Sequence, residues 1–420
     1  MNKLLLAFIF ILLNAGTVCA QISLEECYVL AKNNYPQIKK ADLITKTKDY
    51  SITNANMGYI PKVLFSARAS YQSDVTKMPF DNLPILSNIN IPVLPKDQYK
   101  ISLDIVQPIW DGGKIEAEKE NIKAQSKSEE SSLEVQLYNL KYRVNQLFFS
   151  ILLLDEQLKQ NDLYNQDLER TYNMIKQSVK NGVANSSDLD AVALEQVKTK
   201  QNKAKIEAVK ESYINALEML TGTNINNGLI KPEYTEINDY TVKRPELTYF
   251  SDKINLFETS KKNINVSYMP TFDLFFSAGY GRPGLDMLDD NFQPYYIAGI
   301  KMDWTIAGFY TGERNKKIIE LNKKTLELEK QTFLFNTNID IQNQQAKIKQ
   351  IKDTMSYDDE IVKLRTNIKT SSEIKMKQGT ITVNDYMREV TAENLAKQGK
   401  ILHEIELLQA VYEMKNIINQ

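Results

Sequence analysis

The stretch that decides the fold lies in the second half of the chain and reads Thr271-Phe272-Asp273-Leu274-Phe275-Phe276-Ser277-Ala278-Gly279-Tyr280. Its even-numbered residues are apolar, and its odd-numbered residues are mostly small or polar. A period of two is typical of a β-strand with one apolar face. Three more stretches alternate in this way, at residues 63–72, 99–105 and 296–304. The sequence therefore predicts four strands in two pairs.

The four strands have features of membrane strands. Their lengths are near the ~9–11 residues of a tilted strand that crosses a bilayer. Aromatic residues stand at the ends of the apolar faces: Tyr71, Tyr99, Tyr280, Tyr296 and Trp304. The alternative is an antiparallel hairpin that faces solvent in a soluble domain. If the strands form a membrane barrel, the charged residues of their polar faces line its lumen: Arg68, Lys100, Asp104, Asp273, Lys301 and Asp303.

Four strands cannot cross a bilayer alone, because their open edges would leave backbone groups without partners in hydrocarbon. The sequence therefore predicts an oligomer. Two copies would give eight strands and an interior filled by side chains. Three copies would give twelve, an even number within the range of outer-membrane barrels.

Long helices make up most of the remaining chain. Residues 114–180 contain no proline or glycine, and about 67 residues at ~1.5 Å each would extend ~100 Å. Heptad spacing within this helix joins the following apolar residues: Leu133, Leu137, Leu140, Val144, Leu147, Ile151, Leu154 and Leu158. A second long helix is expected over 313–377. Shorter helices follow at 187–220 and 384–418, after reversals at Gly182 and Gly379.

The chain contains an internal duplication. Pro36 and Pro245 are 209 residues apart, and so are Pro61 and Pro270. Such a period is too long for a solenoid, whose repeats have about 20–50 residues. The predicted organisation is a first repeat at 21–222, a linker at 223–240 and a second repeat at 241–420. Each repeat would hold a helix, a strand pair and a long helical hairpin.

The N-terminus has the features of an export signal. Residues 1–20 contain Lys3, an apolar run and the small-residue sequence Val18-Cys19-Ala20, so a signal peptide is expected to end there. Lipidation of Cys19 is the alternative, although the leucine typical of lipoprotein signals is missing three positions before it. Cys27 would then be the only cysteine, and an intramolecular disulfide would be impossible.

Composition excludes several functions. The formal net charge is −1, so the chain lacks the excess of basic residues that is typical of nucleic-acid-binding proteins. No mature apolar run approaches the ~18–20 residues of a spanning helix. His403 is the only histidine and Cys27 has no evident partner, so neither predicts a metal site or a nucleophile. Gly112-Gly113 lacks the lysine of a phosphate-binding loop. We expect neither an enzyme nor a cofactor.

Four segments resemble the TolC-like outer-membrane efflux protein family. They are residues 23–36 (SLEECYVLAKNNYP), residues 107–113 (QPIWDGG), and the reversals Gly182 to Asp188 and Gly379 to Asp385. The resemblance implies a mainly α fold with β: a homotrimer with a 12-stranded β-barrel, four strands per chain, continuous with a long α-helical coiled-coil barrel. It also implies a periplasmic adaptor protein and an inner-membrane transporter as partners, with outer-membrane lipid around the strands.

The resemblance also points to a periplasmic gate at the reversals. Asp385 matches the first of two inward aspartates of the family, but Arg388 occupies the place of the second. Three copies of Asp385 would form a carboxylate ring, and Arg388 could pair with it and neutralise it. Asp188 matches an aspartate that a tyrosine and an arginine contact in some relatives; this chain has Met376 and Ile381 there. A helix-capping role is the alternative for both aspartates.

These observations predict a passive exit duct of the outer membrane, part of a tripartite efflux or type I secretion system. The alternative is an exported periplasmic coiled-coil adaptor or scaffold without a pore. That alternative explains the heptads but not four alternating strands at matched places in two copies.

Overall fold

The computed structural model describes residues 21–75, 94–225, 228–287 and 289–420. The expected signal peptide at 1–20, with Cys19, lies outside them. The chain divides into two compact units. The first, here called the helical unit, comprises Met1–Lys40, Ser132–Thr248 and Lys330–Gln420; the second, the strand unit, comprises Ala41–Ser131 and Tyr249–Glu329. Each predicted repeat thus supplies segments to both units.

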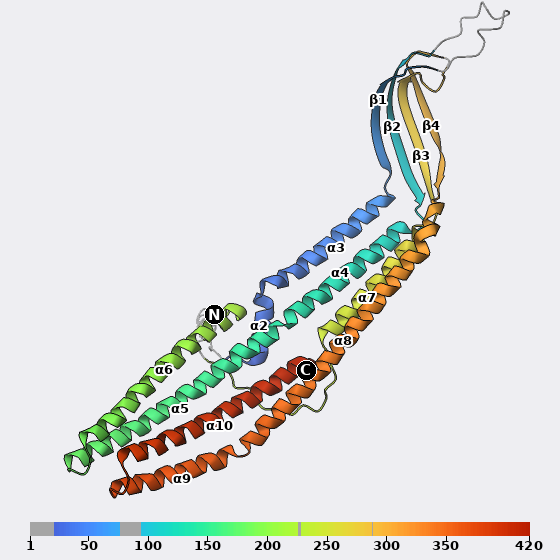
Figure 1. Cartoon of the computed structure of the whole chain (residues 1–420). Helices are drawn as coiled ribbons and strands as arrows, with labels where there is room; N and C mark the ends of the chain where they lie inside the picture. Colours follow the sequence, from blue (N-terminus) through green and yellow to red (C-terminus); the bar gives the residue numbers. More distant parts are fainter. Residues whose placement is uncertain (1–20, 76–93, 226–227, 288) are drawn as a thin grey trace, which may run out of the picture. The chain divides into compact units, whose positions relative to one another are not determined.

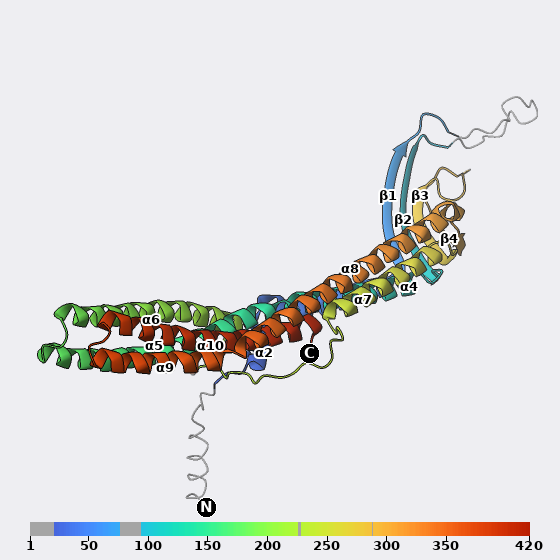
Figure 2. The ribbon, with the colours of Figure 1, turned by 60° about the horizontal axis from the view of Figure 1, so that its bottom comes forward.

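Two long hairpins dominate the helical unit (Figure 1). The first joins α5 (Leu140–Lys180) to α6 (Ser186–Thr221), and the second joins α9 (Asp358–Lys377) to α10 (Val383–Ile418). Helix α10 packs against α5, so the two hairpins lie side by side, and Figure 2 shows both reversals at the same end. The short helices α2 (Leu24–Asn34) and η1 (Pro36–Lys39) also belong to this unit, and α2 contacts α5 and α6.

The main core of the helical unit lies where α2 meets the two hairpins. Phe148 and Phe149 of α5 are fully buried there, with Cys27 of α2 and Ile405 of α10. The predicted heptad residues from Leu133 to Ile151 are buried except Leu147, which is half-buried, and Leu154 and Leu158 are half-buried too. The apolar periodicity therefore identified the buried face of this helix.

The strand unit contains one antiparallel sheet in the order β1-β2-β3-β4. Its strands are β1 (Lys62–Tyr71), β2 (Asp97–Trp110), β3 (Thr271–Arg282) and β4 (Gln293–Asp303), which confirms the four predicted strands. Pro61 and Pro270 directly precede β1 and β3 because proline cannot donate a ladder hydrogen bond. The helices α3 (Lys40–Asn56) and α7 (Pro245–Val266) lead into these strands, with η2 (Met57–Tyr59) after α3 and η4 (Ile306–Gly308) after β4.

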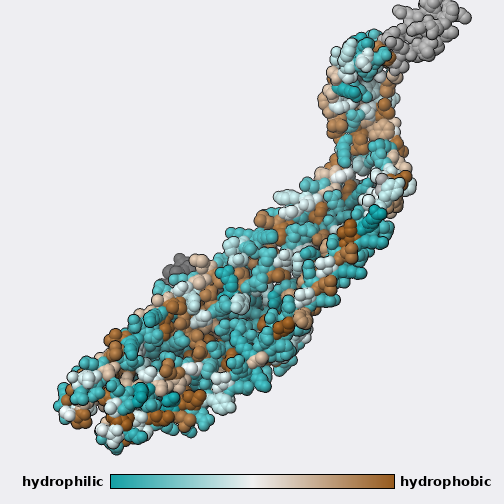
Figure 3. Space-filling model, viewed as in Figure 1, coloured by the Kyte–Doolittle hydropathy of each residue, from teal (hydrophilic) through white to brown (hydrophobic). Residues whose placement is uncertain are grey.

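Within the described residues, no other part of the unit covers the apolar face of the sheet. Phe65 is 68% exposed, Tyr296 72% and Ile300 69%. The space-filling view in Figure 3 shows hydrophobic side chains at the surface over the strands. Since burying such side chains is the main driving force of folding, this face needs an apolar environment from outside the chain.

Each predicted long helix is interrupted once. The first consists of α4 (Lys114–Tyr138) and α5, which meet at Asn139, and the second of α8 (Phe309–Met355) and α9, which meet at residues 356–357. Asn139 keeps right-handed helical dihedrals, with φ −63° and ψ −16°, so the break is a kink and not a reversal. No described helix is both long enough and apolar enough to cross a membrane.

Candidate functional site

The two reversals of the helical unit depend on glycine. Gly182 has φ +73° and Gly379 has φ +72°, a left-handed conformation that other residues adopt at a cost. A Cβ at either position would meet nothing within 4 Å, so backbone conformation and not space requires glycine. Both reversals predicted from the sequence are confirmed.

Asp188 and Asp385 are the third residues of the helices that follow these turns, and each completes a capping box with the N-cap residue, Asn185 or Thr382. The backbone amide of Asn185 donates to Asp188 Oδ2 over 3.0 Å. At the second turn, Thr382 Oγ1 donates to Asp385 Oδ2 over 2.7 Å and accepts from the Asp385 amide over 3.1 Å. Asp385 accepts hydrogen bonds from the hydroxyl and the backbone amide of Thr382, and the positive charge of Arg388 lies beside its carboxylate. Together these contacts hold the pKa of the Asp385 carboxyl below its usual range. The capping role of the aspartates is therefore present in the single chain.

Arg388 contacts the other carboxylate oxygen of Asp385, Oδ1, through its Nη2 atom. The guanidinium is largely exposed, and Asp385 is partly exposed. The two residues lie three positions apart, one turn along α10, so the pair forms within one chain. The carboxylate at this reversal is thus accompanied by a positive charge.

Met376 and Ile381 take part in apolar packing near the reversals. Met376 is buried in a set of residues, here called the tip cluster, and Ile381 packs against it half-buried. The buried members of the tip cluster are Tyr164, Leu168, Ile175, Val192, Met376, Val383, Tyr386, Met387 and Val390. These residues come from α5, α6, α9 and α10, so apolar contacts hold the two hairpins together at this end.

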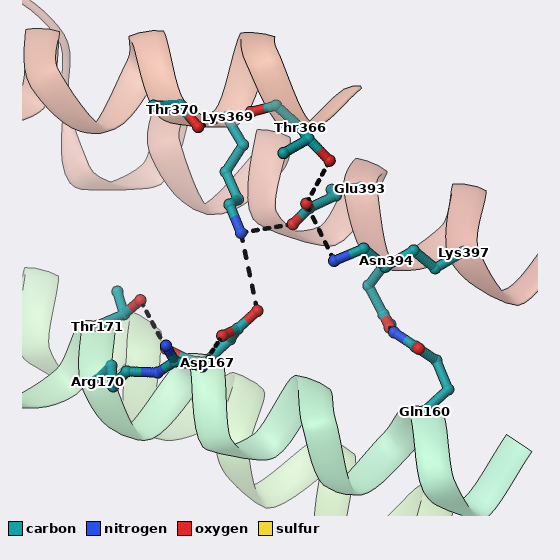
Figure 4. A network of polar contacts seen from close by, with 10 residues as sticks. All are labelled: Gln160, Asp167, Arg170, Thr171, Thr366, Lys369, Thr370, Glu393, Asn394 and Lys397. Atoms are coloured by element: carbon teal, nitrogen blue, oxygen red, sulfur yellow. Dashed lines mark hydrogen bonds and ion pairs between the residues drawn. The ribbon is translucent and has the colours of Figure 1, made fainter. Parts of the chain in front are cut away.

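A network of charged side chains that the sequence analysis did not identify lies on the same hairpins (Figure 4). Its centre is Glu393 of α10, only 3% exposed. Glu393 accepts from Lys369 Nζ at 2.6 Å and lies 3.0 Å from Lys397 Nζ, and Thr366 Oγ1 donates to it over 2.8 Å. Burial alone would raise the pKa of Glu393, but these donors outweigh burial and lower it.

Lys369 links this network to the first hairpin. Its Nζ atom lies 3.7 Å from Asp167 Oδ2 of α5. Nearby, Gln160 Nε2 of α5 donates to Asn394 Oδ1 of α10 over 3.0 Å. In the sequence, only the four-residue spacing of Glu393 and Lys397 hinted at this network. Polar contacts therefore join the hairpins beside the tip cluster.

The six charged residues predicted to line a lumen all lie on the polar face of the sheet, in three groups. Asp104 accepts hydrogen bonds from Ser102 and Ser277. Lys301 Nζ lies 2.7 Å from Asp303 Oδ2, and Asp273 is the register partner of Lys301. Arg68 and Lys100 are register partners near one end of the sheet. Asp273 and Asp303 lie near the other end.

His403 and Cys27 both make contacts that fit a role in the fold. His403 Nδ1 lies 2.9 Å from Asp358 Oδ2, which joins α10 to α9. Burial raises the pKa of the Cys27 thiol to about 12, so this cysteine is unreactive. Among the described residues, no group of three or more His, Cys, Asp or Glu side chains could hold a metal ion.

Comparison with known proteins gives one family and several structures. The family described as "Outer membrane efflux protein" matches residues 27–223. No curated protein sequence matches the chain. Several solved structures match the chain, and the three named here each align with 94% of it. The CmeC outer membrane channel of Campylobacter jejuni has 15% identity and a TM-score of 0.64, and the alignment covers 85% of its own chain. The MtrE outer membrane channel of Neisseria gonorrhoeae has 13% identity and a TM-score of 0.64, with 88% of its own chain covered. The outer membrane protein VceC of Vibrio cholerae has 12% identity and a TM-score of 0.60, with 95% of its own chain covered.

These matches confirm the predicted fold class and the resemblance to outer-membrane efflux proteins. The family match agrees with the expected outer-membrane location and with the expectation of an efflux protein instead of an enzyme.

Proposed function

From this likeness to outer membrane efflux proteins, we propose that the chain is the exit duct of a tripartite efflux or type I secretion system. Three copies form a passive conduit through the outer membrane and periplasm. A periplasmic adaptor and an inner-membrane transporter complete the system, and the transporter supplies the energy.

The observation that carries this proposal is the open-edged sheet with its uncovered apolar face. Within the described residues, β1 and β4 each pair with one strand only, so each has a free backbone edge. In hydrocarbon such edges must pair with another chain. A trimer joins β1 of one copy to β4 of the next and gives twelve strands with lipid against the apolar face.

Helix α8 supports assembly with further copies. Ile318, Leu321, Leu328, Phe335 and Ile339 follow one another at heptad spacing, and all five are exposed in the chain, with Leu321 at 61%, Leu328 at 62% and Phe335 at 66%. A heptad stripe of apolar side chains is the surface by which one helix packs against another. In a trimer this stripe becomes buried between subunits.

A periplasmic coiled-coil adaptor without a pore is the competing function. It would use the same helical stripe. It gives no role to a four-stranded sheet that exposes Phe65, Tyr296 and Ile300 to its surroundings. A periplasmic protein with this surface would be prone to aggregation.

Disulfide trapping tests the proposed assembly directly. Ala67→Cys on β1 is combined with a single cysteine at Tyr296, Ala298 or Ile300 on β4, all on the apolar face. We expect one of these pairs to yield covalent trimers in outer-membrane fractions, because only adjacent strands bring two Cβ atoms within reach. Cys27 is buried and does not compete. Ala67→Cys alone is the control.

The purified trimer should also conduct ions in planar bilayers. Recovery of the protein as a soluble periplasmic species, with no crosslinks at any of the three β4 positions, would contradict the duct and favour the adaptor.

A further inference from the structure

Two positive side chains face each other on the polar face of the sheet. Arg68 of β1 is the direct register partner of Lys100 of β2. Like charges in this arrangement repel. Within the described residues, no carboxylate forms an ion pair with either side chain, and both are exposed. The nearest carboxylate on the same face of β2, that of Asp104, accepts hydrogen bonds from Ser102 and Ser277.

Arg68 and Lys100 line a cavity of about 440 Å³. Ser70, Gln72 and Gln98 line it too and bring neutral hydrogen-bond donors. The third cation of the cavity, Arg282, is already paired: its guanidinium lies 3.5 Å from Asp97 and 3.7 Å from Asp290. Among the described residues, Arg68 and Lys100 are therefore the cations of this cavity that form no ion pair.

Lys100 contacts Tyr295 of β4. The Lys100 Nζ atom lies 5.0 Å from the centroid of the Tyr295 ring, a cation–π contact. The ring in turn lies over Gly279, its register partner on β3, where a Cβ would come within 2.4 Å of the ring. Tyr295 is only 9% exposed. Lys100 thus lies against a buried aromatic ring.

We propose that Arg68 and Lys100 form a binding site for oxyanions, phosphate or carboxylate groups, on solutes that pass through the lumen. This inference rests on the proposed duct. The site lies on the face opposite the apolar one, so its ligand comes from the lumen and not from lipid. Three copies place six cations at one level, and rings of Arg and Lys are the arrangement that favours anions in pores. Paired guanidinium and ammonium groups are strong donors to oxyanions.

Isothermal titration calorimetry with inorganic tripolyphosphate and the purified trimer tests the site. We expect binding that weakens about tenfold or more in Arg68→Gln and in Lys100→Gln, since each removes one charge-assisted contact per copy. Lys96→Gln is the matched control: it removes the same charge just before β2 but outside the lining of the cavity. No binding by the unmodified protein, or equal weakening in Lys96→Gln, would overturn the proposal.

Bilayer recordings separate this inference from the duct itself. With a KCl gradient, we expect the reversal potential of Arg68→Gln and Lys100→Gln to shift towards cation preference, while Lys96→Gln leaves it unchanged. A conducting trimer whose ion preference stays the same in both variants would overturn the oxyanion site and leave the duct intact. A protein that forms neither trimers nor channels would overturn the duct, and with it the ring of six cations.

Discussion

Lys369 of α9 and Glu393 of α10 form an ion pair, with Nζ and Oε2 2.6 Å apart, around a carboxylate that is almost fully buried. Lys369 also reaches towards Asp167 on the other hairpin. A buried charge without its partner lowers the stability of the folded protein. This pair therefore has consequences that can be measured.

Removal of one partner is expected to destabilise the helical unit. Glu393→Ala leaves the ammonium of Lys369 without its closest counter-charge, and breaking a buried pair typically costs about 3–5 kcal/mol. The helical circular-dichroism signal should therefore melt at a clearly lower temperature. Glu389→Ala is the control, because Glu389 pairs with Arg365 at 3.5 Å in a more exposed position. Such surface pairs contribute about 0–1 kcal/mol. Equal melting shifts in the two variants would contradict the assigned role of Glu393.

The same carboxylate predicts a pH dependence. The pKa of Glu393 is lowered in the folded protein from its ordinary value of 4.5, so the folded state favours the ionised form. Its contribution is complete above about pH 4.5 and is lost as pH falls through the lower folded pKa. In melting curves, Glu393→Gln should be less stable than the unmodified protein near neutral pH, and the difference should shrink in acid. A difference that is constant down to pH 3 would speak against an ionised Glu393.

Asp385 and Arg388 are expected to have opposite effects on conduction. Three copies of Asp385 near the tips would form a carboxylate ring, and each Arg388 pairs with one carboxylate. In bilayers, Asp385→Asn should weaken block by divalent cations, and Arg388→Ala should strengthen it. Asparagine is also a good capping residue, but at N3 its acceptor is weaker than a carboxylate, so a melting curve is measured in parallel. Unchanged single-channel traces in both variants would rule out the ring.

Gly279 is expected to tolerate no side chain. A Cβ there would lie 2.4 Å from the Tyr295 ring and 2.6 Å from the Ile101 carbonyl oxygen, so Gly279→Ala should reduce the amount of heat-resistant trimer on gels. Tyr295→Ala should restore it only in part, because the backbone contact remains. Gly399→Ala is the control: a Cβ there meets nothing within 4 Å, and alanine favours a helix by up to about 1 kcal/mol. Full tolerance of Gly279→Ala would show that the ring does not lie over the glycine.

The local elements were accessible to sequence reasoning, because periodicity and turn chemistry act over a few residues. Alternation at 271–280 marked β3, and Gly182 and Gly379 marked the reversals. The breaks at Asn139 and at residues 356–357 were missed, since no proline or glycine stands there. The same alternation that marked the strands also identified their polar faces. The order β1-β2-β3-β4, by contrast, depends on pairings across long connections.

By itself, the sequence determined which segments are helices and strands, which strand face is apolar, and which aspartates lie in the first turn of a helix, because neighbouring residues decide these features. Only the tertiary structure decided that Asp167, Lys369 and Glu393 meet from three helices, and that Arg68 stands opposite Lys100. The first depends on how two hairpins pack, and the second on strand register. A slip of one residue would turn the side chains of a strand to the other face and remove the pair of cations. Register and helix packing are set by the sum of many distant contacts, which no local stretch of the chain contains.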